Sequence, residues 1–223
     1  MRRIFRENGL SIVWLGMFFL TFIFGQTLSG LREFNSDQRE HGRPEVTYSE
    51  YLVSAHFVEA TMENWESEFL QMFLFVALTS FLYQKGSAES KKLDEEEDVD
   101  RDPAKSRNKK DAPWPVRKGG IVLTIYQYSL SLAFLLLFLI SFFLHAAGGA
   151  REYNQDQLEH GSTEMVTTLS YMATSRFWFE SFQNWQSEFL SVGMMVILTI
   201  FLRQRGSPES KPVDAPHSQT GKD

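Results

Sequence analysis

The chain carries nearly the same sequence twice, with the two copies offset by 119 to 120 residues. The stretch Gly30–Gly42 returns as Gly149–Gly161, with nine of thirteen positions identical. Two further stretches also return: Asn64–Leu70 as Asn184–Leu190, and Lys85–Lys91 as Arg205–Lys211. A repeat of this kind makes the copy the building unit of the fold, so both copies must form the same supersecondary structure.

Four apolar blocks lie between these polar stretches. They cover residues 10–28, 69–83, 121–147 and 189–202. A helix needs about 20 apolar residues to cross a bilayer core, and the first and third blocks are that long. The second and fourth blocks reach this length only from Trp65 and Trp185, which places Glu66, Glu68 and Glu188 near the headgroups. The mean hydropathy of −0.24 hides this segregation.

The pattern predicts an all-α membrane protein with four transmembrane helices, arranged as two tandem two-helix repeats with outer amphipathic helices. The first repeat covers residues 1–86, with spans at about 10–30 and 65–84. The second covers 115–206, with spans at about 121–147 and 185–204. A linker at 87–114 and a tail at 207–223 are too polar and charged to build a core, so we expect both to be disordered.

The lysines and arginines predict the orientation. With the N-terminus inside, the inner segments hold 17 of the 22 Lys and Arg residues and the outer segments hold five. This bias predicts that both termini are cytoplasmic. The two copies then face the same way, related by an axis along the membrane normal.

The outer segments show helix signals. His41-Gly42 and His160-Gly161 are typical of helix ends. Apolar residues spaced by four and three from Tyr51 to Trp65 indicate an amphipathic helix, and Thr47 with Glu50 predicts a capping box at its start.

A first candidate site is a set of carboxylates and imidazoles on the helix ends. At a spacing of four they share one helix face, and such groups suit a divalent metal. The alternative is a solvated helix end with no metal, and the spacing alone favours that alternative. The residues are Glu33, Asp37, His41, Glu152, Asp156 and His160.

A second candidate site is a polar cluster at the outer membrane interface. An Arg–Glu pair would lower the cost of a carboxylate close to hydrocarbon, and an asparagine one turn away would donate to it. The simplest role is structural, with polar contacts that fix how the helices pack, and a proton or cation relay is the alternative. The residues are Arg32, Asn64, Glu68, Arg151, Asn184 and Glu188.

The composition limits the partners and the chemistry. There is no cysteine, and no phosphate-binding loop or nucleophile motif is present, so we predict no catalytic residues and no cofactor beyond a divalent metal. The basic linker residues lie next to a predicted span, which favours anionic lipid over nucleic acid as their partner. A second copy of the chain is a further expected partner.

The repeated motifs R-E-[F/Y]-N-x-D-Q-x-E-H-G, N-W-x-S-E-F-L and [K/R]-G-S-x-E-S-K carry a resemblance. They resemble a family of small bacterial integral membrane proteins, a domain of unknown function. The resemblance covers nearly the whole chain and implies a bacterial cytoplasmic membrane location. It implies no activity, substrate or catalytic residue.

Three function classes follow from the sequence. The leading one is a non-enzymatic membrane protein with a structural or interaction role and an organised periplasmic face. The second is a small transporter or channel component that uses the intramembrane carboxylates Glu68 and Glu188. The third is a metal-dependent membrane enzyme.

Overall fold

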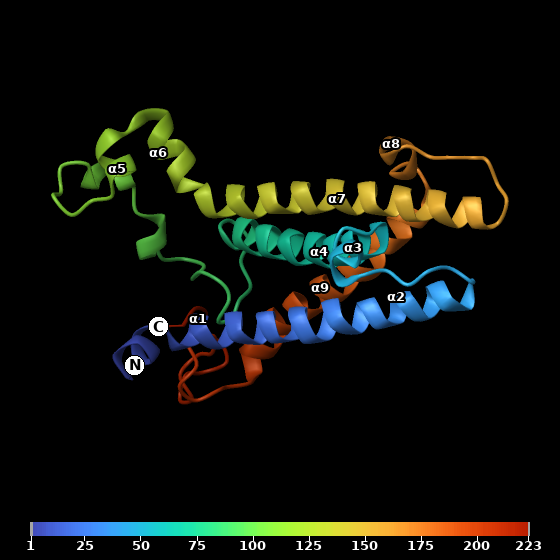
Figure 1. Ribbon diagram of the computed structural model, residues 1–223. Coiled ribbons are helices and arrows are strands. Elements are labelled where there is room, and N and C mark those ends of the chain that lie inside the picture. The colour runs from blue at the N-terminus through green and yellow to red at the C-terminus, as the bar shows by residue number, and fades with distance from the viewer. Residues whose placement is uncertain (1, 223) are drawn as a thin grey trace. The chain divides into compact units, whose positions relative to one another are not determined.

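The computed structural model describes residues 2–222, and within that range it is helical with no β-strand (Figure 1). The longer helices are α1 (Arg2–Leu20), α2 (Leu28–Glu40), α4 (Ala55–Thr79), α6 (Gly120–Gln127), α7 (Ser129–Glu159) and α9 (Ser175–Phe201). Short helices are α3 (Tyr48–Tyr51), α5 (Trp114–Lys118) and α8 (Thr168–Tyr171). A π-helical segment, η1 (Thr21–Thr27), joins α1 to α2, and the short 3₁₀ turns η2 (Asp98–Asp100) and η3 (Pro103–Ser106) lie in the linker.

The chain divides into two compact units. The first unit contains Met1–Thr61 and Leu144–Tyr171. It holds α1, η1, α2, α3 and α8, together with the start of α4 and the end of α7. The second unit contains Met62–Phe143 and Met172–Asp223, and so holds most of α4, the start of α7, and α9 with the linker and tail.

Two helical stretches of the described chain are long and apolar enough to cross a membrane. They are Arg3–Glu40, which runs through α1, η1 and α2, and Ser129–Glu159, which is α7. By length and hydropathy alone, the described chain therefore offers two such helices where the sequence predicted four. The helices α4 and α9 miss this standard because their first halves carry glutamates, and in α4 only about 16 Å remains after Glu68, a stretch that also contains Gln71.

The predicted outer amphipathic helix is not a separate element. The one-turn helix α3 comes first, the chain breaks at residues 52–54, and α4 then runs without interruption from Ala55 to Thr79. The amphipathic segment and the second apolar block are thus one helix. No Gly or Pro lies between Ala55 and Thr79, so nothing in the local sequence ends the helix between them.

The other helix boundaries follow the local signals closely. The helix α2 ends at Glu40, with Gly42 in the left-handed region at φ +68°, and α7 ends at Glu159, with Gly161 at φ +74°. Both predicted helix ends are therefore confirmed. At the inner side, α4 ends at Thr79, five residues before the expected end of its span at residue 84.

The predicted capping box is confirmed at the start of α3. The Thr47 hydroxyl accepts from the Glu50 amide at 3.4 Å, and the Thr47 amide donates to the Glu50 carboxylate at 2.7 Å. The Thr47 hydroxyl also donates to the Glu50 carboxylate at 2.8 Å, and the bonds from the Thr47 backbone and then from its hydroxyl hold the pKa of Glu50 below its ordinary value.

We expect this cap to weaken in acid. Because the pKa of Glu50 is lowered on folding, its contribution is complete above the unfolded pKa of about 4.3 and is lost as the pH falls through the lowered folded value. Hydrogen exchange of residues 47–52 should therefore be several-fold faster in E50Q than in the wild type at pH 7, with the difference vanishing near pH 3.

The equivalent position of the second copy supplies the control. Ser170 stands there, and its hydroxyl makes the same contact with the Thr167 amide at 2.7 Å without a titratable group. The ratio of the hydrogen-exchange rates of S170A and the wild type at residues 167–172 should be the same at pH 7 and near pH 3. A pH-independent effect of E50Q would contradict the prediction.

Candidate functional site

One asparagine closes the outer turn of each copy. In the first unit, the Asn35 amide donates to the Val46 carbonyl at 3.0 Å and accepts from the Val46 amide at 2.8 Å. Asn154 makes the same two bonds with Val166, at 2.9 Å and 2.7 Å. A side-chain amide has the donor and the acceptor needed to pair with a backbone in this way. The repeated asparagine therefore fixes the loop that follows the helix end.

The glycine that opens each repeated motif allows a close approach of a tyrosine. A side chain at Gly149 would lie 2.5 Å from a ring carbon of Tyr171, and Gly30 faces the Tyr51 hydroxyl in the same way. Tyr51 is 2 % exposed and Tyr171 is fully buried. Only glycine leaves room for these rings, so its repetition reflects packing.

The histidine that ends each motif bonds to its own helix. The ring Nδ1 of His41 lies 2.9 Å from the Asp37 carbonyl, and that of His160 lies 2.8 Å from the Asp156 carbonyl. The Asp37 carbonyl and then the Asp37 carboxylate raise the pKa of His41. Each of these carbonyls also accepts from the backbone amide of the same histidine at 3.1 Å, so the ring adds a second contact at the helix end.

An ion pair between Arg43 and Glu159 joins the two copies within the first unit. The hydrogen bond to Glu159 raises the pKa of the Arg43 guanidinium. Both side chains are partly buried, at 28 % and 20 % exposed, so the pair is less screened than a surface ion pair. The loop that follows the first motif thus contacts the helix end of the second.

The residues predicted to bind a metal occupy this region without forming a compact ligand set. Glu33 is exposed and Glu152 is half-buried, while Asp37 with His41 and Asp156 with His160 form the local pairs described above. None of the six belongs to a compact set of possible metal ligands among the described residues.

A bound divalent metal stays a prediction, and elemental analysis of the purified protein checks it. If the helix-end residues hold an ion, the wild type retains about one divalent ion per chain and the H41A/H160A double variant retains none. A wild-type sample without stoichiometric metal would end this hypothesis.

In the second unit, α4 and α9 contact each other through equivalent positions of the two copies (Figure 1). Gln71 donates to the Ser191 hydroxyl at 2.9 Å, and these residues are 120 positions apart. Gln183 donates to Glu63 at 3.2 Å, again across 120 positions. Contacts between equivalent positions require two parallel helices in register, as expected for copies that share one orientation.

A buried carboxylate lies at the centre of this contact. Glu66 is fully buried, and the indole N–H of Trp185 donates to it at 3.0 Å. Glu63, one turn earlier, accepts from Asn184 at 2.6 Å as well as from Gln183. We call this set the α4–α9 seam: Glu63, Glu66, Gln71, Gln183, Asn184, Trp185 and Ser191.

Only part of the predicted interface cluster takes part in the contacts of the α4–α9 seam. The amide of Asn184 donates to Glu63 and to the Glu180 carbonyl, which uses both of its N–H groups in place of the expected bond to Glu188. Glu188 contributes its backbone carbonyl, which accepts from Gln71 at 3.0 Å.

The remaining members of the predicted cluster lie at the surface. Glu68 and Asn64 are exposed in the second unit, while Arg32 and Arg151 are exposed in the first. The pairing of these arginines with Glu68 and Glu188 stays a prediction.

Sequence reasoning missed Glu63 and Glu66, although a signal was present. The first copy has glutamate at both positions, where the second copy has Gln183 and Gln186. A carboxylate that becomes an amide in the other copy indicates complementary roles, because one accepts and the other donates. Comparison of the differences between the copies would have identified the seam.

The third repeated motif forms the same turn twice in the second unit. Ser90 accepts from the Gln84 amide and Ser210 from the Gln204 amide, each at 2.9 Å. Gly86 and Gly206 take left-handed conformations at φ +86° and +84°. The repeated [K/R]-G-S-x-E-S-K letters therefore encode a turn after each long helix.

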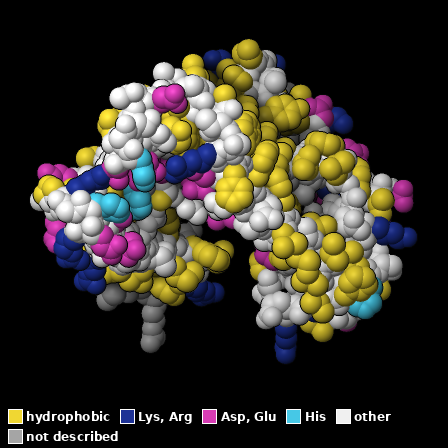
Figure 2. Space-filling view, turned by 90° about the vertical axis from the view of Figure 1, so that its right-hand side faces the viewer, with side chains coloured by type: hydrophobic (Ala, Val, Ile, Leu, Met, Phe, Trp, Pro, Cys, Tyr) yellow, Lys and Arg dark blue, Asp and Glu magenta, His cyan; other side chains and the backbone are white. Residues whose placement is uncertain are grey.

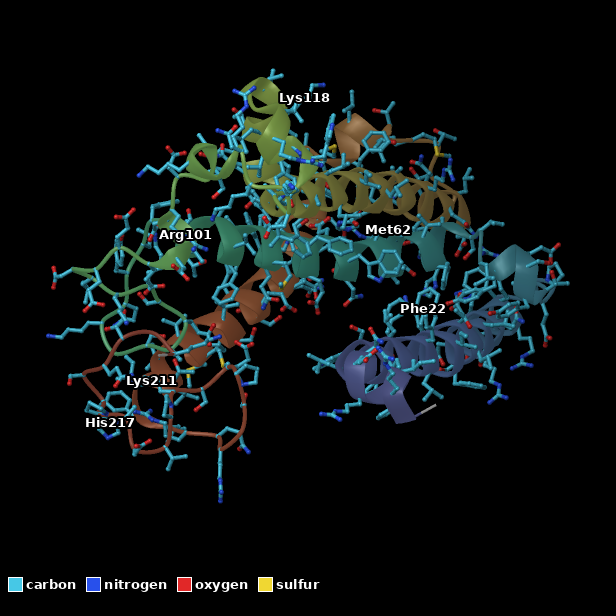
Figure 3. All side chains as sticks on the ribbon, turned by 90° about the vertical axis from the view of Figure 1, so that its left-hand side faces the viewer. Phe22, Met62, Arg101, Lys118, Lys211 and His217 are labelled. Carbon is cyan, nitrogen blue, oxygen red and sulfur yellow. The ribbon has the colours of Figure 1, made fainter. Side chains whose placement is uncertain are left out.

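The linker and the tail make specific contacts around these turns, which the prediction of disorder did not anticipate. Lys211 is 1 % exposed, and its ammonium donates to the carbonyls of Gly86 at 2.5 Å and Gln219 at 2.8 Å (Figure 3). Burial lowers the pKa of Lys211. Its counterpart Lys91 pairs with Asp100 at 2.6 Å. The disorder of 87–114 and 207–223 in solution stays a prediction, and residue 223 lies outside the described range.

These observations define an all-α protein with two helices that are apolar and long enough to cross a membrane. The chain belongs to the family described as a domain of unknown function, DUF6766, whose model matches residues 1–222. No curated protein and no solved structure matches the chain.

Proposed function

We propose that this chain is a four-span bacterial inner-membrane protein with a structural or interaction role, and that its outer turns form an organised periplasmic face. The observation that carries the proposal is the use of the repeated polar residues. Asn35, Asn154, His41 and His160 are occupied by bonds that close turns and helix ends. Such residues build a surface of fixed shape, which suits a binding or scaffolding role better than catalysis.

Exposed apolar side chains support the membrane part of the proposal. On α1, Leu10 is 74 % and Trp14 is 64 % exposed, and on α7, Leu136 is 58 % exposed. Figure 2 shows hydrophobic side chains over broad areas of one face. Water-exposed apolar area of this extent is rare in soluble monomers, whereas lipid tails cover it without cost.

The proposal also places α4 and α9 across the bilayer. From Trp65 to Thr79, α4 is about 22 Å long and mainly apolar, with its polar residues other than Thr79 before Met72, and the loop residues after it extend the stretch. A carboxylate at that depth needs a protein partner, and Glu66 points to Trp185 on α9. Both termini are then cytoplasmic, in agreement with 17 Lys and Arg residues on the inner segments against five outside.

Reporter fusions test this topology. A phosphatase or fluorescent reporter after residue 100 or at the C-terminus is expected to report the cytoplasm, because these positions follow an even number of spans. Insertions after Gly42 and Gly161 are expected to report the periplasm. A periplasmic signal at residue 100 would overturn the four-span arrangement.

A transporter or channel component is the second candidate, and the buried carboxylate of Glu66 favours it. Carboxylates within membrane helices commonly serve proton or cation pathways. Glu68 and Glu188 lie near this residue in the second unit, and their charges are close enough to interact. Against a complete pathway, the apolar halves of α4 and α9 carry no further acidic residue.

Flux measurements separate the two candidates. Under the structural proposal, E68Q/E188Q proteoliposomes are expected to show the same proton and cation flux as wild type, with any loss confined to folding yield. The exposed outer-loop variant E164Q serves as the control. Flux in the wild type that disappears in a well-folded E68Q/E188Q protein would favour transport instead.

A further inference from the structure

The second unit contains an apolar groove between the inner halves of α4 and α9. Its volume is about 540 Å³, within the range of small-molecule and lipid-chain sites. Leu74 and Leu78 of α4 line one wall, and Val192 and Val196 of α9 line the other. From Gln71 to Thr79 the α4 wall is about 12 Å long.

The groove exists on one side of the seam because the two copies differ there. Gly193 of the second copy lines it, and the equivalent residue of the first copy is Phe73. A side chain added at Gly193 would meet no atom within 4 Å. The missing side chain therefore leaves open space that a phenylalanine would otherwise fill.

The inner end of the groove is polar and holds a buried carboxylate. Glu89 lines the groove, and its side chain is only 7 % exposed. Its Oε1 atom has no hydrogen-bond partner among the described residues. Lys222 forms an ion pair with Oε1 at 3.7 Å, and the same ammonium lies 2.5 Å from Glu209, so two carboxylates share one cation.

The surrounding charges indicate which headgroup fits. Lys91 pairs with Asp100 at 2.6 Å and Lys92 with Glu95 at 3.4 Å, so the neighbouring cations are already matched by acids. Glu89 has only a share of the Lys222 ammonium, and its Oε1 atom has no hydrogen bond, whereas a buried carboxylate is stabilised by a close charged donor. A primary ammonium offers three N–H donors, whereas a quaternary ammonium offers none.

We propose that this groove binds an aminophospholipid of the inner leaflet, with one acyl chain between α4 and α9 and the headgroup ammonium donating to Glu89. The site rests on the proposed membrane placement, in which residues 87–114 are cytoplasmic. Binding is non-covalent and needs no other reactant. The apolar walls accept the chain, and the buried carboxylate selects the headgroup.

Native mass spectrometry of the full chain in detergent tests the site directly. With phosphatidylethanolamine, phosphatidylcholine and phosphatidylglycerol added at equal concentration, the ethanolamine lipid is expected to dominate the bound species. E89Q should reduce its retention roughly tenfold, the usual effect of losing a charged hydrogen bond. The control is E164Q, because Glu164 is an exposed carboxylate of the first unit, outside the unit that contains the groove.

A second variant keeps the test decisive if E89Q folds poorly. G193L fills the groove without a clash and should abolish retention of all three lipids, while G16L, also at an open helical glycine, should leave it unchanged. Equal retention by wild type and E89Q, equal loss in E164Q, or preference for phosphatidylglycerol would overturn the proposal. Loss of a dimer in G193L with lipid retention intact would show that a second copy fills the groove, which also overturns it. The reporter fusions read topology separately from lipid retention, so the two proposals fail independently.

Discussion

The arrangement of α4 and α9 depends on the hydrogen bonding of the Glu66 carboxylate, which is fully buried. A carboxylate removed from water costs several kcal/mol unless donors replace its hydration. The indole of Trp185 supplies one such donor, and Gln183 and Asn184 supply others to Glu63. Because all three donors lie on α9, the two helices must be parallel and in register, and a shift by one residue would leave the acids without these bonds.

The seam explains why a duplicated chain does not keep two identical copies. In a symmetric pair of helices, a glutamate would face a glutamate at every equivalent position, which repulsion disfavours. The chain has acids at Glu63 and Glu66 in the first copy and amides at Gln183 and Gln186 in the second. At Glu63 and Glu66 the first copy accepts and the second donates, whereas at Gln71 the first copy donates to the second. The copies also differ in the partners of their repeated lysines: Lys91 pairs with Asp100, and Lys211 donates to backbone carbonyls of the turns.

Sequence patterns predicted those features that depend on neighbours along the chain. The helix ends at Gly42 and Gly161 and the capping box at Thr47 follow from residues within one turn of each other. The prediction of a separate amphipathic helix at residues 51–65 was wrong. Periodicity distinguishes an amphipathic segment from an apolar one, but it does not show whether one helix contains both. The hydrogen bonds between the Asn35 side chain and the Val46 backbone were also not predicted, because the partners are eleven positions apart and no local sequence rule links them.

The candidate site was harder to predict for a physical reason. The repeated sequence predicted a site at Arg32, Glu68 and their counterparts, whereas repetition at this level mainly reflects turns and close packing that both copies need. Chemistry that acts once per molecule requires the copies to differ. The seam acids and the open position at Gly193 are such differences, and both lie on the α4–α9 pair in the second unit.

The seam and the groove occupy different lengths of this helix pair, because α4 and α9 pack parallel and in register. On α4, the polar contacts lie between Glu63 and Gln71, and the apolar groove follows Gln71. A single helix pair thus has a polar, hydrogen-bonded end and an open apolar end, and the second arises because one copy has glycine where the other has phenylalanine.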